Sequence, residues 1–252
     1  MNPVREFASR RNSYFMASLL VEKFVDSALA QLRRRGLMLS PGQLPERMRD
    51  SSIPPLNDWI GWREVPSVVT DAELNALEQE TGLMYPLIYR DFLKYRHFVE
   101  LSEIGIGFEK HLCNDWQATL RKAYFRSWPR KQILDIGLLP FGRETNLESG
   151  PVCFDTRKRD VDGDCPVVFW DHEWVGGEKE IQPLFSSCRK MFDCLSFATT
   201  TDVNFIHHFP DDDPTQLILK SRLLGNFLAL DPEGAGGPGR AYWTCWGVDP
   251  AA

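Results

Sequence analysis

The stretch GWREVPSVVTDAELNALEQETGLMYPLIYRDFL, residues 61–93, decides the fold of this chain. Thr70 is followed three residues later by Glu73, which is the spacing of a capping box, where each side chain satisfies a backbone N–H at the start of a helix. Gly82 supplies the left-handed residue that commonly ends a helix. The stretch therefore predicts a helix over residues 71–81.

A second helix is predicted from Pro86, because the fixed backbone of proline suits the first helical turn. The apolar face of this helix is formed by Tyr85, Ile88, Tyr89, Phe92 and Leu93. Upstream, apolar residues recur at three- and four-residue steps over residues 5–35 and predict one long amphipathic helix. Residues 37–56 contain four prolines and are expected to form a linker.

Downstream, short apolar runs alternate with turn signals. Strands are expected at 104–108, 136–141, 152–155 and 166–170, and helices at 112–127 and 183–199. Asp162-Gly163 is a hairpin signal between the last two strands. Residues 215–230 fit either a helix or two strands, 231–239 a flexible loop, and the end of the chain a strand or a docked tail.

This order of elements predicts an α+β fold with a mostly antiparallel sheet. We expect an N-terminal helix and proline-rich linker at 1–56 and an α+β domain at 57–199. A C-terminal extension at 200–252 is expected to pack on the same core.

The composition is that of an ordinary soluble globular protein, since 43% of the 252 residues are hydrophobic and 25% are charged. The net charge of −6 argues against a dedicated nucleic-acid binder, which needs a basic face for phosphates. The charge is uneven, at +4 over residues 1–50, −2 over 51–142 and −8 over 143–252. The acidic C-terminal half is either a plain solvated surface or a face that meets a basic partner.

Targeting signals are not evident. No apolar run reaches 18 residues, so we expect no transmembrane helix, and the N-terminus lacks the pattern of a signal peptide. The six cysteines form no C-x-x-C motif and are interpreted as reduced thiols of a cytoplasmic protein.

Three blocks of the chain, taken in order, resemble the SUKH superfamily, also called the Smi/Knr family. The blocks are residues 61–93, then Leu139-Pro-Phe-Gly142 with a strand ending at Phe154-Asp155, then PVVFWDH (166–172) with the helix around Phe185–Leu195. The resemblance covers about residues 59–198. Tyr95-Arg-His-Phe98 departs from it, because the family usually has an Asn-Gly-Gly-like turn there. This departure indicates an insertion or a variant subfamily.

The resemblance implies helices packed on a curved, mostly antiparallel sheet, and a binding protein rather than an enzyme. Bacterial members resemble one another in being immunity proteins of polymorphic toxin systems, each of which binds and blocks a cognate toxin domain, often a nuclease. Fungal relatives act as cell-wall and signalling scaffolds. The resemblance therefore implies an immunity protein whose partner is a toxin domain, with a non-enzymatic regulatory scaffold as the alternative.

The sequence offers no complete metal or cofactor site. Asp160, Asp162 and Asp164 are spaced like the start of a calcium loop, but Cys165 and Asp171 stand where such a loop needs Gly and Glu. A solvated turn is the favoured interpretation of these aspartates. We expect no metal and no cofactor.

Other polar residues give weaker signals. His207 and His208 are adjacent, so in a strand they would point to opposite faces and not share a metal. His172 beside Asp171 suits an acid or base, and a hydrolase that uses it is a third hypothesis, but no nucleophile motif accompanies it. The glycine-rich stretch 234–239 contains proline and precedes no predicted helix, so it is not read as a phosphate cradle.

A protein that blocks a nuclease can imitate nucleic acid with carboxylates, and aromatic anchors add tightness. The expected toxin-binding residues are therefore Asp160, Asp162 and Asp164 in the hairpin, Asp171, Glu173 and Trp174 after the last strand, and Asp211, Asp212 and Asp213 in a later turn. We expect no nucleic-acid or membrane partner. A monomer and a weak dimer both stay open.

Overall fold

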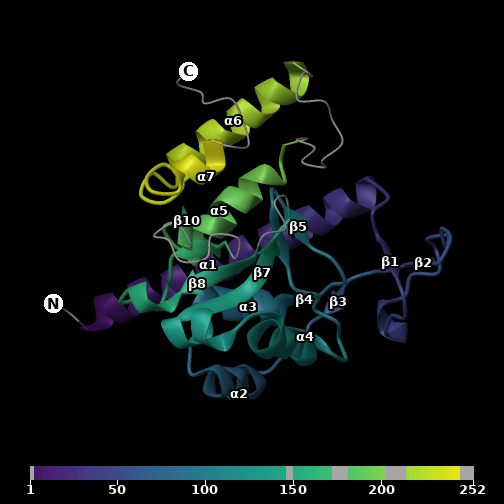
Figure 1. The fold of residues 1–252 in the computed structure, drawn as a ribbon, viewed down its shortest axis with the longest axis horizontal. Helices are drawn as coiled ribbons and strands as arrows, with labels where there is room; N and C mark the ends of the chain where they lie inside the picture. Colours follow the sequence, from purple (N-terminus) through teal and green to yellow (C-terminus); the bar gives the residue numbers. More distant parts are fainter. Residues whose placement is uncertain (1–2, 146–149, 172–180, 202–213, 245–252) are drawn as a thin grey trace.

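The centre of the molecule is a six-stranded sheet, in the spatial order β10–β9–β8–β7–β6–β5 with every neighbouring pair antiparallel (Figure 1). The computed structural model describes residues 3–145, 150–171, 181–201 and 214–244. The strands are β5 (Ser102–Glu103), β6 (Ile106–Phe108), β7 (Leu138–Glu144), β8 (Pro151–Asp155), β9 (Val167–Trp170) and β10 (Ile181–Phe185). Two further antiparallel pairs are β1 (Leu39–Pro41) with β2 (Trp59–Gly61) and β3 (Val65–Pro66) with β4 (Arg96–His97).

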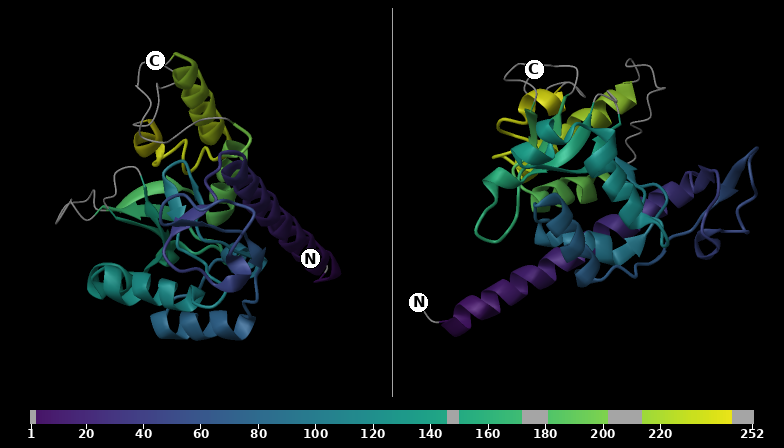
Figure 2. Two further views of the ribbon diagram at one scale, coloured as in Figure 1. Left: turned by 90° about the vertical axis from the view of Figure 1, so that its right-hand side faces the viewer. Right: turned by 60° about the horizontal axis from the view of Figure 1, so that its bottom comes forward.

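Helices surround this sheet, which makes the fold α+β as predicted. They are α1 (Pro3–Arg34), α2 (Asp71–Thr81), α3 (Leu87–Tyr95), α4 (Trp116–Lys122), α5 (Cys188–Ala198), α6 (Pro214–Leu230) and α7 (Arg240–Thr244). The added N-terminal helix α1 runs along one side of the body, and α6 and α7 form the C-terminal extension at the top of Figure 1 (Figures 1 and 2).

The capping box predicts the start of α2 correctly. The Glu73 backbone N–H donates to Thr70 Oγ1 at 3.3 Å, and the Thr70 N–H donates to Glu73 Oε2 at 2.9 Å. The helix ends at Gly82, whose φ of 75° is the left-handed conformation that glycine adopts without strain. The predicted second helix is α3, for which Pro86 is the N-cap.

Aromatic rings fill the space between the helices and one face of the sheet. Phe92 of α3 lies 4.7 Å from Phe108 of β6 and 5.4 Å from Phe192 of α5, measured between ring centroids. Phe24 of α1 lies 5.5 Å from Phe192, so three helices meet one strand in this cluster. The opposite face carries a smaller cluster of Ile133, Leu138, Cys153, Val168 and Trp170. This division follows from the alternation of side chains along each strand.

The Leu139-Pro-Phe-Gly142 block forms the middle of β7. Gly142 pairs with Phe108 across the ladder, just after a shift of register at Pro140. A Cβ at Gly142 would overlap the carbonyl oxygen of Gly107 on β6. The close approach of these two strands therefore requires glycine at the end of the block.

Two predicted elements are wrong in part. Residues 104–108 do not form one strand, because Ile104 (φ 41°) and Gly105 (φ 79°) make the turn between β5 and β6. Residues 183–199 do not form one helix, since the segment up to Phe185 belongs to β10 and α5 begins only at Cys188. Ser187 marks this start, because its side chain accepts the Lys190 backbone N–H.

The expected linker at 37–56 contains ordered structure. Strand β1 pairs with β2, and the side chains of Met38, Leu44 and Met48 are buried. We call residues 39–61 the β1–β2 arm, which projects at the right of Figure 1.

The expectation of a flexible loop at 231–239 is wrong as well, because hydrogen bonds hold this segment in place. Asp231 is fully buried and accepts the backbone N–H groups of Ser186, Gly234 and Ala235 at 2.8, 3.1 and 3.1 Å. The glycines wind the chain closely around this carboxylate, and a Cβ at Gly234 would overlap Ser186.

The segment predicted as either a helix or two strands forms a helix, α6. Residues 240–244 form the short helix α7 instead of the expected strand or tail. The Trp243 indole N–H donates to the Leu184 carbonyl of β10 at 2.9 Å. Helices α6 and α7 share the main buried cluster through Leu223, Leu224, Phe227, Tyr242 and Trp243.

Candidate functional site

The predicted acidic hairpin is the connection between β8 and β9, residues 156–166. Asp160 Oδ1 accepts the backbone N–H groups of Asp162 and Asp164 at 2.9 and 2.8 Å, and the Asp160 N–H donates to the Asp164 carbonyl at 2.9 Å. Gly163 takes a φ of 82°, as the Asp-Gly turn signal predicts. The hairpin is therefore held in one shape by its own first aspartate.

Arg159 fixes this hairpin to the connection between α2 and α3. The guanidinium donates from Nη1 to the carbonyls of Gly163 and Tyr85 at 2.5 and 3.3 Å, and from Nη2 to the carbonyl of Met84. Two segments more than seventy residues apart in the sequence thus form one continuous surface.

Asp164 points inward, away from that surface. Its Oδ1 accepts the N–H groups of Cys165 and Cys188 at 2.7 and 3.0 Å, and its Oδ2 accepts the Arg189 N–H at 3.1 Å. Burial raises the pKa of the Asp164 carboxyl, although these three N–H donors act in the opposite direction. Because Cys188 and Arg189 open α5, this carboxylate serves the start of that helix. Only Asp160 and Asp162 of the predicted trio are exposed.

Of the other predicted residues, the structure describes only Asp171. Asp171 follows β9 and is buried, with 6% of its surface exposed. Glu173 and Trp174 lie outside the described residues, as does His172. The range 202–213, with Asp211, Asp212, Asp213 and the adjacent histidines, also lies outside them.

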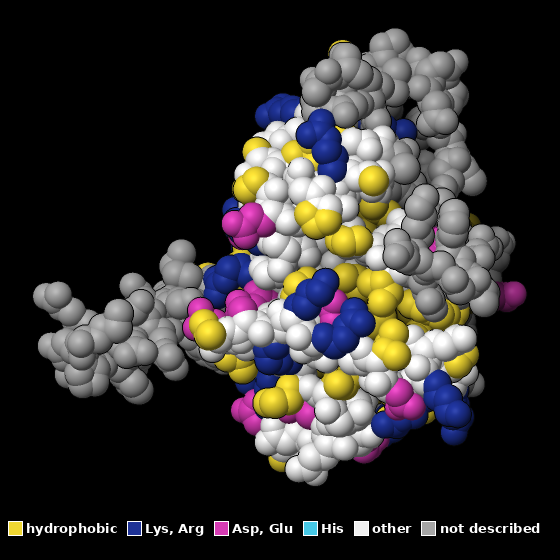
Figure 3. All heavy atoms as spheres, turned by 60° about the vertical axis from the view of Figure 1, so that its left-hand side comes forward, with side chains coloured by type: hydrophobic (Ala, Val, Ile, Leu, Met, Phe, Trp, Pro, Cys, Tyr) yellow, Lys and Arg dark blue, Asp and Glu magenta, His cyan; other side chains and the backbone are white. Residues whose placement is uncertain are grey.

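Several acidic residues of the C-terminal half that the structure describes are not at the surface. Glu144, Asp155, Asp171 and Asp231 are all buried. Burial disfavours the charged form of Asp155, but hydrogen bonds from Arg157 at 2.7 and 2.9 Å hold its pKa below the usual value. On the face shown in Figure 3, Lys and Arg side chains are interspersed with Asp, Glu and hydrophobic ones. In the hairpin, the exposed carboxylates are Asp160 and Asp162, while the exposed Arg157 and Lys158 pair with the buried Asp155.

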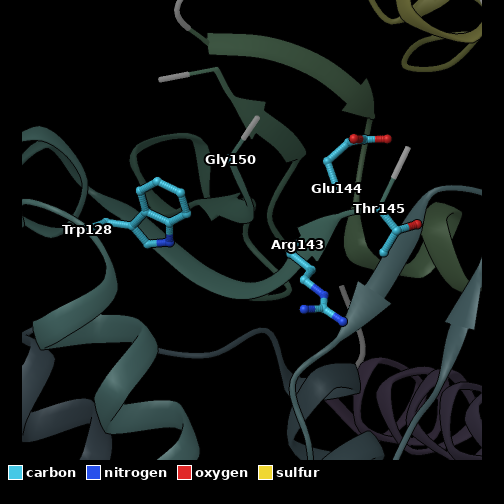
Figure 4. A pocket seen from close by; sticks show the side chains of 5 residues that line it. All are labelled: Trp128, Arg143, Glu144, Thr145 and Gly150. Atoms are coloured by element: carbon cyan, nitrogen blue, oxygen red, sulfur yellow. The ribbon is translucent and has the colours of Figure 1, made fainter. Parts of the chain in front are cut away.

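A pocket of about 290 Å³ lies at the end of β7 (Figure 4). Its described lining is Trp128, Arg143, Glu144, Thr145 and Gly150. The Tyr242 hydroxyl donates to Glu144 Oε1 at 3.1 Å, and the Trp128 ring meets Trp170 edge-on at 5.8 Å. The described lining thus combines an aromatic ring, a cation, a carboxylate and a hydroxyl.

Sequence reasoning missed a buried pair of histidines. His97 of β4 and His111 stack with ring centroids 4.6 Å apart, and both side chains are buried. His97 Nε2 accepts the Val68 N–H at 3.1 Å, and His111 Nδ1 lies 3.0 Å from the Arg96 carbonyl. Burial, followed by the influence of His97, lowers the pKa of His111 to about 3. The bridge between Phe98 and His111 brings the two histidines together, and no local motif in the sequence signals it.

In the part of the chain that the structure describes, His, Cys, Asp and Glu side chains form no group of three or more that would hold a metal ion. Among the described helices, none is long and apolar enough to cross a bilayer.

A known protein family matches the middle of the chain. The sequence model of the SMI1 / KNR4 family (SUKH-1) matches residues 68–194, about half of the chain. The matched segment begins just before α2 and ends within α5, so it contains the six-stranded sheet and the hairpin. No curated protein matches the chain.

Proposed function

The chain belongs to the SMI1 / KNR4 family (SUKH-1), and from this membership we propose that it is an immunity protein. It binds a cognate toxin domain by direct protein–protein contact and neutralises it without catalysing a reaction. The family match over residues 68–194 is the observation that carries the proposal. Its free thiols, such as Cys153 and Cys194, suit a cytoplasmic site of action, where thiols stay reduced.

The described structure supports a binding role in two ways. Hydrogen bonds of Asp160 and Arg159 hold the hairpin in one conformation, so a partner binds a preorganised surface. Its exposed carboxylates, Asp160 and Asp162, suit a partner with a basic face, such as a nuclease whose cleft binds phosphates. Neutralisation then requires only that the complex cover that cleft.

Co-expression tests the proposal. The toxin domain encoded next to this chain is expressed from an inducible promoter, with and without the full chain, and survival and complex formation by size-exclusion chromatography are measured. We expect the chain to restore growth and to elute with the toxin domain. Toxicity that persists at saturating levels of the chain, with no shared elution peak, would reject the immunity role and favour the regulatory scaffold.

A further inference from the structure

Three large apolar side chains are exposed on the two segments that Arg159 joins. Met84 is 62% exposed, Leu87 is 50% exposed and Val161 is 98% exposed. Met84 lies between α2 and α3, Leu87 is the first residue of α3, and Val161 lies in the hairpin. A Cβ built at Gly163 would lie 3.9 Å from Leu87 Cγ, so the hairpin contacts the start of α3 directly.

This surface differs from a scatter of single exposed residues, which is normal on soluble proteins. Both segments that carry the apolar side chains are ordered by buried or shared hydrogen bonds. Tyr85, next to Met84, donates its N–H to Glu78 Oε1 at 2.9 Å, and its hydroxyl shares a 2.7 Å hydrogen bond with Tyr124. Binding here would therefore freeze few backbone degrees of freedom.

Two carboxylates flank the most exposed apolar residue. Asp160 and Asp162 stand on either side of Val161, and both are exposed. Among the described residues, neither takes part in an ion pair, whereas Asp164 is turned inward onto α5. An apolar centre with an acidic rim is complementary to an apolar side chain surrounded by Lys and Arg.

We propose that Met84, Leu87 and Val161, with Asp160 and Asp162 at their rim, form the docking surface for a basic segment of the partner protein that packs an apolar side chain onto them. This inference rests on the proposed function, because it names the surface through which the toxin domain is held. The apolar residues determine the lifetime of the complex, since desolvated contacts dominate dissociation. The two aspartates accelerate association through long-range attraction.

The test measures binding kinetics of the full chain to a catalytically inactive form of the toxin domain encoded beside it. The apolar variant is Leu87→Ser with Val161→Ser, and the charge variant is Asp160→Asn with Asp162→Asn. Asparagine at position 160 keeps an oxygen that can accept the two backbone N–H groups of the hairpin. The matched control is Leu56→Ser on the β1–β2 arm, where the side chain is 61% exposed.

We expect the apolar variant to raise the dissociation constant at least about 30-fold, mainly through faster dissociation. The charge variant is expected to slow association about five- to tenfold at low salt and to weaken the salt dependence of the rate. The control is expected to bind like the unsubstituted chain. Unchanged circular dichroism and melting temperature show that each variant is folded.

The outcomes separate the surface from the function. If the unsubstituted chain binds and neutralises the toxin but the apolar and charge variants do so equally well, the docking surface is wrong and the immunity role stands. If the control variant loses as much affinity as the apolar variant, the surface assignment is likewise overturned. If the unsubstituted chain does not bind the toxin domain, the proposed function fails, and the inference that rests on it fails with it.

Discussion

Acidification should destabilise this protein through the buried pair His97 and His111. A histidine buried in its neutral form gains a proton more easily when the chain unfolds, so the unfolded state binds more protons below its own pKa of about 6.5. The folded-state pKa of His111 is lowered to about 3, by burial first and by His97 second. The stabilisation is therefore complete above pH 6.5 and is lost as the pH falls from there toward 3. Burial lowers the pKa of His97 as well, so its contribution has the same sign.

The expected size follows from the two pKa values of His111. His111 has a pKa of about 6.5 in the unfolded chain and about 3 in the folded one. Between pH 7 and pH 5 this difference lowers the free energy of unfolding by about 2 kcal/mol. The charged groups that act on the pair are Arg47 and Glu73, which have opposite effects on the pKa of His97. Elsewhere, burial raises the pKa of Glu103 to about 7, so the folded state binds this proton more tightly than the unfolded state does. Acidification below pH 7 therefore raises the free energy of unfolding through Glu103. A comparison with a variant is needed to separate the two effects.

His111→Asn provides that comparison, because the asparagine amide can replace Nδ1 as the group facing the Arg96 carbonyl. Urea unfolding followed by tryptophan fluorescence at pH 7 and pH 5 gives the free energy of unfolding of both proteins. The unsubstituted chain should lose about 2 kcal/mol more than the variant over this interval, while Glu103 contributes equally to both. Trp116→Phe is the control, since it alters the edge contact with His111 and leaves the histidine able to titrate. Equal pH-dependent losses in the unsubstituted chain and in His111→Asn would refute the reasoning.

Three further predictions concern polar groups that hold the fold. Asp231→Asn should lower the free energy of unfolding by about 2–3 kcal/mol in urea titrations, because an amide would face the N–H donors that the buried carboxylate accepts, that of Ser186 among them. Tyr85→Phe and Tyr124→Phe should each cost about 1–3 kcal/mol, and the double variant less than their sum, because each single change leaves a buried hydroxyl without its partner; additive losses in this cycle would contradict the 2.7 Å bond. Asp164→Asn should lower the melting temperature by about 2–4 °C, because it removes a negative charge at the start of α5, and an unchanged melting temperature would show that the carboxylate is not needed there.

Local signals in the sequence predict the ends of helices correctly. The capping box of Thr70 and Glu73 and the glycine at 82 predict α2 because all the atoms involved lie within a few residues of one another. The sequence pattern predicts less where a segment pairs with residues far away in the chain. Residues 183–185 are predicted as helix because their apolar residues continue into α5, but their pairing with β9 makes them a strand. Tertiary pairing therefore decides the elements that periodicity leaves ambiguous.

The same limit applies to the residues of the candidate site. The Asp-Gly signal locates the hairpin, but three aspartates spaced two apart look alike in the sequence. Asp164 differs from Asp160 only because α5 presents its first N–H groups to it. The exposed Met84 and Leu87 gave no signal, since the second helix places similar residues on its buried face. The join between hairpin and helix depends on Arg159 reaching backbone carbonyls more than seventy residues away.

The position of α7 beside β10 has a consequence for the solubility of the protein. An antiparallel sheet that does not close has two edge strands, whose unpaired backbone groups can pair with a strand of another molecule. At one edge, β5 is only two residues long and exposes few backbone groups for such pairing. At the other, the indole of Trp243 occupies the Leu184 carbonyl, and Gly239 lies against the backbone of the same strand. The C-terminal extension thus covers part of this edge, and we expect a chain cut before α6 to aggregate through β10.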